Sequence, residues 1–310
     1  YIIMTDLKLY GYKQYFDELS NIYLNKKLPN KIIFSGRKGI GKCYFVNHFI
    51  NFILSINEEY SYDSNNNLIN QKNKSFNLVK NNSHPNFYKI KQEDGKKNID
   101  ISQIRNLYDF VNRSSFNNKL KIVLIEDIEN LSINSSNALL KLIEEPNKNV
   151  QYFLIHDISK HVIDTIKSRC INYNLILDNN YKKSIIDHYF GQNIYDNLPN
   201  DLKNHFLTPG DIISLINLII SLKLDIENFD IETFLNHLIK ENIYKNKQVS
   251  INSIKILIEM LFSSRYKDSK NENLLKLSRY FNKKFSEVMN FNLDLEIFFL
   301  EFKSKIINAK

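Results

Sequence analysis

One glycine-rich segment carries the most specific chemical pattern in the chain: Gly36-Arg37-Lys38-Gly39-Ile40-Gly41-Lys42-Cys43. It holds three of only seven glycines, and it follows a short apolar run and opens a helix-period segment. In the pattern G-x-x-x-x-G-K, glycines let the backbone wrap around phosphates, and amides at the helix N-terminus bind the anion. Lys42 would reach the β- and γ-phosphates. We therefore predict a phosphate loop, with a glycine turn that binds no ligand as the alternative.

The last loop position departs from the usual pattern. Ser or Thr there would place a hydroxyl on Mg²⁺, whereas Cys43 offers a soft sulfur that a hard cation avoids. We therefore expect ATP or ADP with Mg²⁺ to bind weakly, or the site to be vestigial. An occupied loop and an empty loop both fit these residues.

Two acids follow a second apolar run, Ile122–Ile125. They are Glu126 and Asp127. A phosphate-loop ATPase places a Mg²⁺-binding Asp and then a catalytic carboxylate at such a strand end. Because the order is swapped here, we expect impaired hydrolytic geometry. Two solvated acids at the end of a strand are the alternative.

The elements that would position these residues follow from hydrophobic periodicity. Apolar runs alternate with helix-period segments over the first 175 residues, which indicates an α/β domain with a largely parallel five-stranded sheet. The expected strands are 31–35, 87–90, 121–125, 152–155 and 171–175. The expected helices are 42–56, 101–113, 135–145 and 162–168, with Asp100 and Asn134 as N-caps and Pro146 ending the third.

The remaining segments complete a three-part organisation. Residues 57–83 are rich in Asn, Ser and Lys and lack a sustained period, so they are interpreted as a surface insertion. Beyond Asp178 only helices are expected, at 181–189, 209–222, 231–241, 250–262, 271–290 and 293–307. The predicted domains are an α/β domain over 1–176, a small helical domain over 177–226 and a helical bundle over 227–310.

Composition limits the functional classes. The chain has 45 Asn and 2 Ala, and only 6 of its 42 basic residues are Arg, a bias typical of an AT-rich genome. The net charge of +8 is compatible with nucleic-acid association, but the inflated Lys content weakens that argument. We interpret the lysines of 119–121 and 283–284 as solvated faces, with DNA contacts as the alternative.

Targeting and redox signals point to the cytoplasm. No apolar stretch has the length of a membrane helix, and the N-terminus lacks the pattern of a signal peptide. The two cysteines, Cys43 and Cys170, are 127 positions apart and form neither a disulfide framework nor a metal site. We interpret Cys170 as a small buried residue.

Further strings add a family resemblance. These are Asn137-Ala138-Leu139-Leu140-Lys141-Leu142-Ile143-Glu144-Glu145-Pro146, then Ser168-Arg169-Cys170, together with His84-Pro85-Asn86-Phe87-Tyr88, Gly95-Lys96 and the segment 99–111. With the phosphate loop, they resemble the clamp-loader branch of the AAA+ ATPases, and within it the delta-prime subunits of bacterial DNA polymerase III. The likeness is strong over residues 30–175 and architectural beyond them.

The resemblance implies a mechanism for Arg169. In this family the arginine of S-R-C projects into the nucleotide site of a neighbouring subunit, where it stabilises charge on the γ-phosphoryl group in trans. Because 36 of the 42 basic residues are Lys, an Arg at this position argues that the guanidinium matters. Ser168 would support that turn or the phosphate contact. A surface arginine at a helix terminus is the alternative.

The resemblance also implies an architecture and partners. The three predicted domains would be an AAA+ domain, a helical lid and an oligomeric collar. The partners would be the gamma or tau and delta subunits in a pentameric ring, the sliding clamp and primed DNA, with no membrane. His156 and Asp157 fall near the family's sensor 1 position, with strand-end polar residues as the alternative. The apolar residues of the last helices would form bundle core or a subunit interface; they include Phe281, Phe291, Phe298, Phe299 and Leu300.

Three departures separate the chain from a motor subunit. The loop ends in Cys43, the segment 57–83 has no zinc-binding cysteines, and Gly210 stands where a motor places a sensor arginine. We therefore expect no zinc, and no ATPase activity of the chain itself within the polymerase holoenzyme. The alternative is an ATP-hydrolysing motor, gamma- or tau-like or another AAA+ remodeller, in which Lys42 and the pair Glu126 and Asp127 act in cis.

Overall fold

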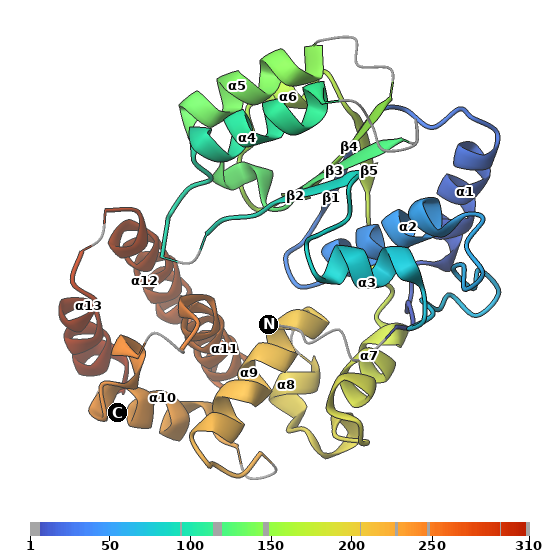
Figure 1. The fold of residues 1–310 in the computed structure, drawn as a ribbon. Coiled ribbons are helices and arrows are strands. Elements are labelled where there is room, and N and C mark those ends of the chain that lie inside the picture. The colour runs from blue at the N-terminus through green and yellow to red at the C-terminus, as the bar shows by residue number, and fades with distance from the viewer. Residues whose placement is uncertain are drawn as a thin grey trace. The chain divides into compact units, whose positions relative to one another are not determined.

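The computed structural model describes residues 7–93, 95–113, 120–144, 149–204, 206–226, 229–246, 249–291 and 293–307. The chain divides into two compact units, Tyr1–Ile185 and Ile186–Lys310 (Figure 1). Within the described ranges, no helix has both the length and the apolar character needed to cross a bilayer. The further division at residue 226 into lid and collar stays a prediction.

The first unit is built on a five-stranded parallel sheet in the order β2-β3-β4-β1-β5. The strands are β1 (Lys31–Gly36), β2 (Phe87–Ile90), β3 (Lys121–Ile125), β4 (Val150–Asp157) and β5 (Ile171–Asn174). All five expected strands are present, and β4 is longer than expected at both ends. Gly36 pairs with Asp157 in the register of β1 and β4, so the start of the loop lies beside the end of β4.

Helices cover both faces of this sheet (Figure 1). They are α1 (Lys13–Leu24), α2 (Lys42–Ser55) and α3 (Lys74–Lys80) on one side, and α4 (Ile101–Asn112), α5 (Ile133–Glu144) and α6 (Asp164–Lys167) on the other. Successive side chains of a strand point to opposite faces. Ile32 and Phe34 of β1 therefore join the core beneath α1 and α2, whereas Ile33 joins the core beneath α4 and α5.

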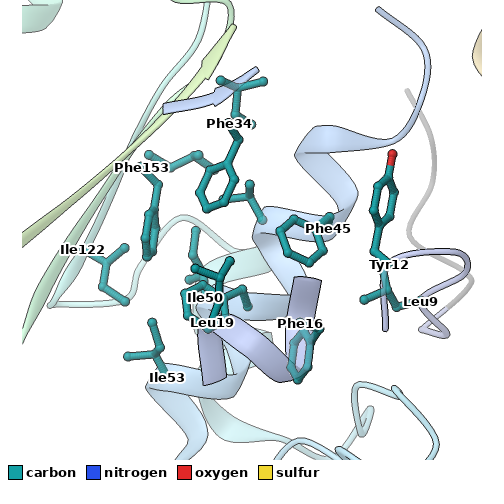
Figure 2. Close-up of a cluster of buried hydrophobic side chains, with 14 of the residues drawn as sticks. Leu9, Tyr12, Phe16, Leu19, Phe34, Phe45, Ile50, Ile53, Ile122 and Phe153 are labelled. Atoms are coloured by element: carbon teal, nitrogen blue, oxygen red, sulfur yellow. The ribbon is translucent and has the colours of Figure 1, made fainter. Parts of the chain in front are cut away.

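The first core is rich in aromatic rings. Figure 2 shows Phe34 and Phe153 of the sheet facing Phe45 of α2, with Phe16 of α1 below Phe45 in this view. The ring centroids of Phe34 and Phe45 lie 5.7 Å apart, and the two rings are nearly perpendicular. Aromatic pairs prefer this edge-to-face arrangement. This packing fixes α2, and with it the phosphate loop, against the sheet.

Three expectations for this unit were wrong or incomplete. The segment 57–83 is not only a surface insertion, because it contains α3 and buries Tyr62, Ile69 and Phe76 in the first core. Helix α1 was not expected at all. Asn134 is not the N-cap of α5, since the helix starts at Ile133 and the Ser132 hydroxyl accepts the amide hydrogen of Ser135.

The prediction was right for Asp100 at the start of α4 and wrong for Lys121, which contacts the end of that helix. Asp100 caps α4 in a capping box with Gln103, as predicted. Lys121, by contrast, is not on a solvated face: it is buried, and its Nζ donates to the carbonyls of Phe110 and Val111 at the end of α4. Lys119 and Pro146 lie outside the described residues.

No strand follows β5 in the described part of the chain, as predicted. The helices are α7 (Asn180–Phe190), which crosses the boundary between the units, α8 (Asn200–Asn204), α9 (Pro209–Ser221), α10 (Ile231–Lys240), α11 (Ile251–Ser269), α12 (Glu272–Phe291) and α13 (Leu295–Phe302), with a π-helical end Lys303–Ile307. Thr208 caps α9 in a capping box with Asp211, which places Gly210 in the first turn.

The aromatic residues of the last helices divide between core and surface. Phe281, Phe298 and Phe299 are buried, and the ring of Phe281 meets that of Phe298 edge-to-face at 5.8 Å. Phe291 and Leu300 are mostly exposed. The bundle core predicted here is therefore present, and an apolar surface remains at the end of the chain.

Candidate functional site

The glycines of the loop occupy positions that only glycine tolerates. Gly39 and Gly41 have φ of +81° and +89°, in the left-handed region that side chains disfavour. A Cβ on Gly36 would lie 2.7 Å from the carbonyl oxygen of Leu175, so a side chain there would collide with backbone. Gly41 also precedes the first residue of α2, so the loop delivers the amides of that helix terminus.

A tyrosine outside the motif anchors the loop. The buried Tyr12 donates its hydroxyl to the carbonyl oxygen of Ile40 at 2.7 Å, and burial raises the pKa of that hydroxyl. Figure 2 shows Tyr12 beside Phe45 at the edge of the aromatic core. Nothing in the sequence distinguished this tyrosine from the seventeen others.

The loop lysine is folded back on its own loop. Lys42 is buried, and its Nζ donates to the carbonyl oxygens of Gly36 and Arg37, both at 2.8 Å. Burial lowers the pKa of Lys42, while the charges of nearby carboxylates oppose that shift. These carboxylates belong to Asp157, Glu129 and Asp127. Two of the three ammonium hydrogens therefore hold the loop itself.

The strand-end acid and the last loop residue are in direct contact. Cys43 donates its thiol hydrogen to Oε1 of Glu126, with 2.5 Å between the heavy atoms. Lys89 of β2 places its Nζ 2.6 Å from the same oxygen. Sequence reasoning missed Lys89, which is one lysine among many, and only the pairing of β2 with β3 brings it to Glu126.

These contacts bear on whether Mg²⁺ fits. In the phosphate-loop pattern, the metal would lie between the residue at position 43 and the acid at position 126. Here a thiol replaces the hydroxyl ligand, and an ammonium already contacts the carboxylate. A hard cation requires oxygen ligands and is repelled by an ammonium at that distance. Mg²⁺ therefore does not fit these residues.

The other strand-end acids have separate roles. Asp127 adopts a left-handed backbone, φ +51°, at the turn into a short 3₁₀ segment. That segment carries Glu129, whose Oε2 accepts the amide hydrogen of Asp157 at 3.2 Å, and burial raises the pKa of Glu129. The swapped pair thus lies at one strand end with a third acid that no sequence motif singled out.

His156 and Asp157 are both buried at the end of β4. Nδ1 of His156 lies 3.2 Å from the hydroxyl of Ser35, and its Nε2 lies 3.0 Å from the carbonyl oxygen of Lys160. A carbonyl only accepts, so Nε2 carries the proton. Asp157 accepts the amide hydrogen of Ser159. The contacts of both side chains join β4 to β1 and to the turn that follows.

The remaining loop residues differ in their exposure to solvent. Arg37 and Lys38 are exposed, whereas Ile40 is buried against the first core. Lys182 of α7 is buried, and its burial and the charge of Arg37 both lower its pKa. A second lysine thus lies near the loop, which the sequence pattern did not indicate.

Arg169 belongs to a separate group of residues. Its Nε lies 2.6 Å from Oε1 of Glu144, and its Nη1 donates to the carbonyl oxygen of Thr165 at 2.9 Å. Nη1 also lies 3.4 Å from the hydroxyl of Ser168, which itself donates to Thr165. The side chain of Arg169 keeps 38% of its exposure. The structure therefore forms two groups, one at the loop and one around Arg169.

Cys170 was predicted to be buried, but it is only partly buried and packs against the second core. Burial raises the pKa of its thiol to about 11. A protonated thiol is a poor nucleophile, so the residue next to Arg169 has a packing role.

Comparison with known proteins assigns the family. The profile described as "DNA polymerase III, delta subunit" matches residues 11–178, which is more than half of the chain. The chain belongs to this family. The match contains the phosphate loop, the strand-end acids and the Ser168-Arg169-Cys170 string, and it ends before the helical second unit. The predicted clamp-loader resemblance is thereby confirmed.

Individual relatives of this DNA polymerase III family member agree. DNA polymerase III subunit delta' of Pseudomonas aeruginosa is 36% identical over 89 residues, which are 29% of this chain and 27% of that protein. The delta' subunit of Buchnera aphidicola from Schizaphis graminum is 27% identical over 225 residues, 68% of this chain and 67% of that protein. The match to the first of these relatives thus spans about a quarter of its length.

The solved structure of another protein has a fold similar to that of this chain. A DNA polymerase III gamma subunit-related protein of Thermotoga maritima covers 93% of this chain and 98% of its own, with a TM-score of 0.52 and 17% identity. Together with the sheet order and the phosphate loop, this confirms the predicted AAA+ fold with a helical C-terminal region.

Proposed function

We propose that this chain is a cytoplasmic, non-motor subunit of the DNA polymerase III clamp loader, equivalent to delta-prime. In this proposal it joins gamma or tau and delta subunits in a pentameric ring that loads the sliding clamp onto primed DNA. Its contribution is structural, together with one arginine supplied in trans. The family assignment over residues 11–178 supports the subunit identity.

The geometry of Arg169 is the observation that supports its action in the nucleotide site of a neighbouring subunit. Its Nε contacts Glu144 and its Nη1 contacts Thr165 and Ser168, and within the described residues Nη2 has no hydrogen-bond partner. A guanidinium held through Nε and Nη1 still offers the hydrogens of Nη2 to phosphate oxygens. Charge developing on a neighbour's γ-phosphoryl group would be stabilised in this way.

The second supporting observation concerns the chain's own loop. Its lysine is bound to loop carbonyls, and Glu126 is engaged by Cys43 and Lys89. Hydrolysis in cis requires a metal ion and a free carboxylate at these positions. The arrangement therefore favours a subunit without its own ATPase over the motor alternative.

The experiment is an ATPase assay of the ring reconstituted with gamma and delta of the same organism, with clamp and primed DNA present. Arg169→Ala is expected to leave the ring assembled and to lower turnover by about 10³-fold. Arg169→Lys is expected to fail similarly, because an ammonium lacks the planar pair of donors. Arg113→Ala, an exposed arginine of the same unit, is the control and is expected to retain turnover.

Two results would overturn the proposal. Unchanged turnover of the assembled Arg169→Ala ring would remove the trans role. Robust Mg²⁺-dependent phosphate release by the isolated chain, abolished by Lys42→Ala, would show a motor instead.

A further inference from the structure

We infer that the ammonium of Lys89 takes the place of the divalent cation in this phosphate loop, so that the site excludes a metal–nucleotide complex. The inference concerns the chain's own loop. It stands whether or not Arg169 acts in a neighbouring subunit.

The geometry places two hydrogen donors on one oxygen. Oε1 of Glu126 lies 2.5 Å from the sulfur of Cys43 and 2.6 Å from Nζ of Lys89. The contact of Lys89 joins an ammonium to a carboxylate and is charge-assisted. A metal ion bound to the same oxygen would need both donors to leave.

The sheet delivers Lys89 to this point. β2 pairs in parallel with β3, and Lys89 is the register partner of Leu124, two residues before Glu126. The side chain therefore needs to extend only along the strand direction to reach the carboxylate. Only 31% of the Lys89 side chain and 16% of the Glu126 side chain are exposed, so the pair is sheltered from solvent screening.

The charge of Lys89 already occupies the carboxylate, since its Nζ and Oε1 of Glu126 form an ion pair. A divalent ion brought to the same carboxylate would face this charge directly.

Cys43 excludes the metal for a second reason. Its sulfur stands where the phosphate-loop pattern has a hydroxyl oxygen. A hard cation prefers oxygen ligands, so a soft thiol there is a poor ligand for it.

This geometry implies that a metal site is latent in the loop. Removing the ammonium would free Oε1 of Glu126, and replacing the thiol with a hydroxyl would supply a second oxygen ligand. Oxygen ligands are those that Mg²⁺ and Mn²⁺ prefer. The variant Lys89→Met with Cys43→Ser should therefore bind a divalent cation that the native chain rejects.

The test is a titration of Mn²⁺, followed by electron paramagnetic resonance, into the full chain with and without ADP. We expect no protein-bound Mn²⁺ at the loop of the native chain. The double variant should bind about one Mn²⁺ per chain, at least tenfold more tightly than the native chain, with added ADP strengthening binding. Lys27→Met with Cys43→Ser is the matched control, because exposed Lys27 lies between α1 and β1 and outside the loop, and it should behave as the native chain does.

Two outcomes would overturn the inference. One is Mn²⁺ or Mn²⁺–ADP bound by the native chain and lost in Glu126→Gln. The other is a folded double variant that binds Mn²⁺ no better than the native chain.

If the double variant does not fold, a measurement on the native chain still tests the inference. Ligands that bind the folded state raise the melting temperature. Millimolar Mg²⁺ added to ADP should leave the melting temperature of the native chain where ADP alone puts it. A further rise caused by Mg²⁺ would show that the cation enters the loop, and would overturn the inference.

Discussion

Nε of Arg169 and Oε1 of Glu144 lie 2.6 Å apart, which joins the S-R-C turn to the last residue of α5. Glu144 belongs to the E-E-P string, so two strings separated by more than twenty residues meet in one contact. The salt bridge binds the base of the guanidinium and leaves the side chain partly exposed. This relationship assigns Glu144 a positioning role for Arg169.

The first prediction tests that role. Glu144→Gln removes the charge that orients Nε, and misplacement of a reacting group by about 1 Å costs up to about 10²-fold in rate. We expect the assembled ring to lose about tenfold or more in ATPase turnover. The melting temperature of the isolated chain should barely change, because exposed ion pairs contribute about 1 kcal/mol or less.

The control for this prediction is Glu259→Gln, which removes the charge of a partly exposed glutamate of α11 that pairs with Lys255. It is expected to change neither turnover nor stability. Glu144→Asp keeps the charge and should retain part of the turnover. Full turnover in Glu144→Gln would mean that Arg169 needs no partner in its own chain.

The second prediction concerns Lys121. Its buried ammonium donates to the carbonyls of Phe110, Val111 and Arg113, which the end of α4 leaves without helical partners. Lys121→Met leaves those carbonyls unsatisfied, at a cost of roughly 1–3 kcal/mol in the free energy of unfolding. Urea denaturation measures the loss. The exposed Lys26→Met should lose less than about 0.5 kcal/mol, and equal losses in the two variants would refute the capping role.

The third prediction is a pH dependence at His48. The ring is fully buried, and desolvation lowers its pKa from 6.5 to about 3. Between these values the unfolded chain binds a proton that the folded chain does not, so stability falls as pH decreases from 6.5 towards 3. The slope expected from this group is up to about 1.4 kcal/mol per pH unit.

The comparison is with His48→Gln, measured by urea denaturation from pH 7 to pH 4. That variant should lack this part of the slope, while the slopes from other groups remain. The same slope in both proteins would show that His48 titrates normally in the folded chain.

The fourth prediction concerns Gly36. Its Cβ position lies 2.7 Å from the carbonyl oxygen of Leu175, so Gly36→Ala must displace backbone of the loop or of the segment after β5. We expect a loss of about 1–3 kcal/mol in the free energy of unfolding. Gly191→Ala, where nothing lies within 4 Å, isolates the backbone cost of a positive φ, about 1 kcal/mol. Equal losses would mean that the loop gives way freely.

The fifth prediction concerns the apolar end of the second unit. Leu293, Ile297 and Leu300 are more than half exposed at helical spacing, and Phe291 precedes them. If this surface is the collar interface, Ile297→Glu should abolish assembly with gamma and delta subunits in size-exclusion chromatography, and the chain alone should melt as before. Ser286→Glu, on an exposed position of α12, adds the same charge and should assemble.

The sequence by itself determined the five strands, the glycine-rich loop and the family, but not helices α1 and α3. Phosphate binding by backbone amides needs glycines at fixed spacing, so the spacing of Gly36, Gly39 and Gly41 was enough to locate the loop. Strand identity followed from apolar runs that are buried on both faces of a parallel sheet. These signals are local in the chain, which is why they can be read from it.

Only the tertiary structure decided the contacts between segments. Lys89 meets Glu126 because β2 pairs with β3, and Tyr12 meets Ile40 because α1 packs beside α2. Lys121 has the sequence context of a surface lysine, yet the end of α4 surrounds it. Residue types alone carry no such information in a chain rich in lysine and tyrosine, because a contact is made by the distance between side chains and not by their identity.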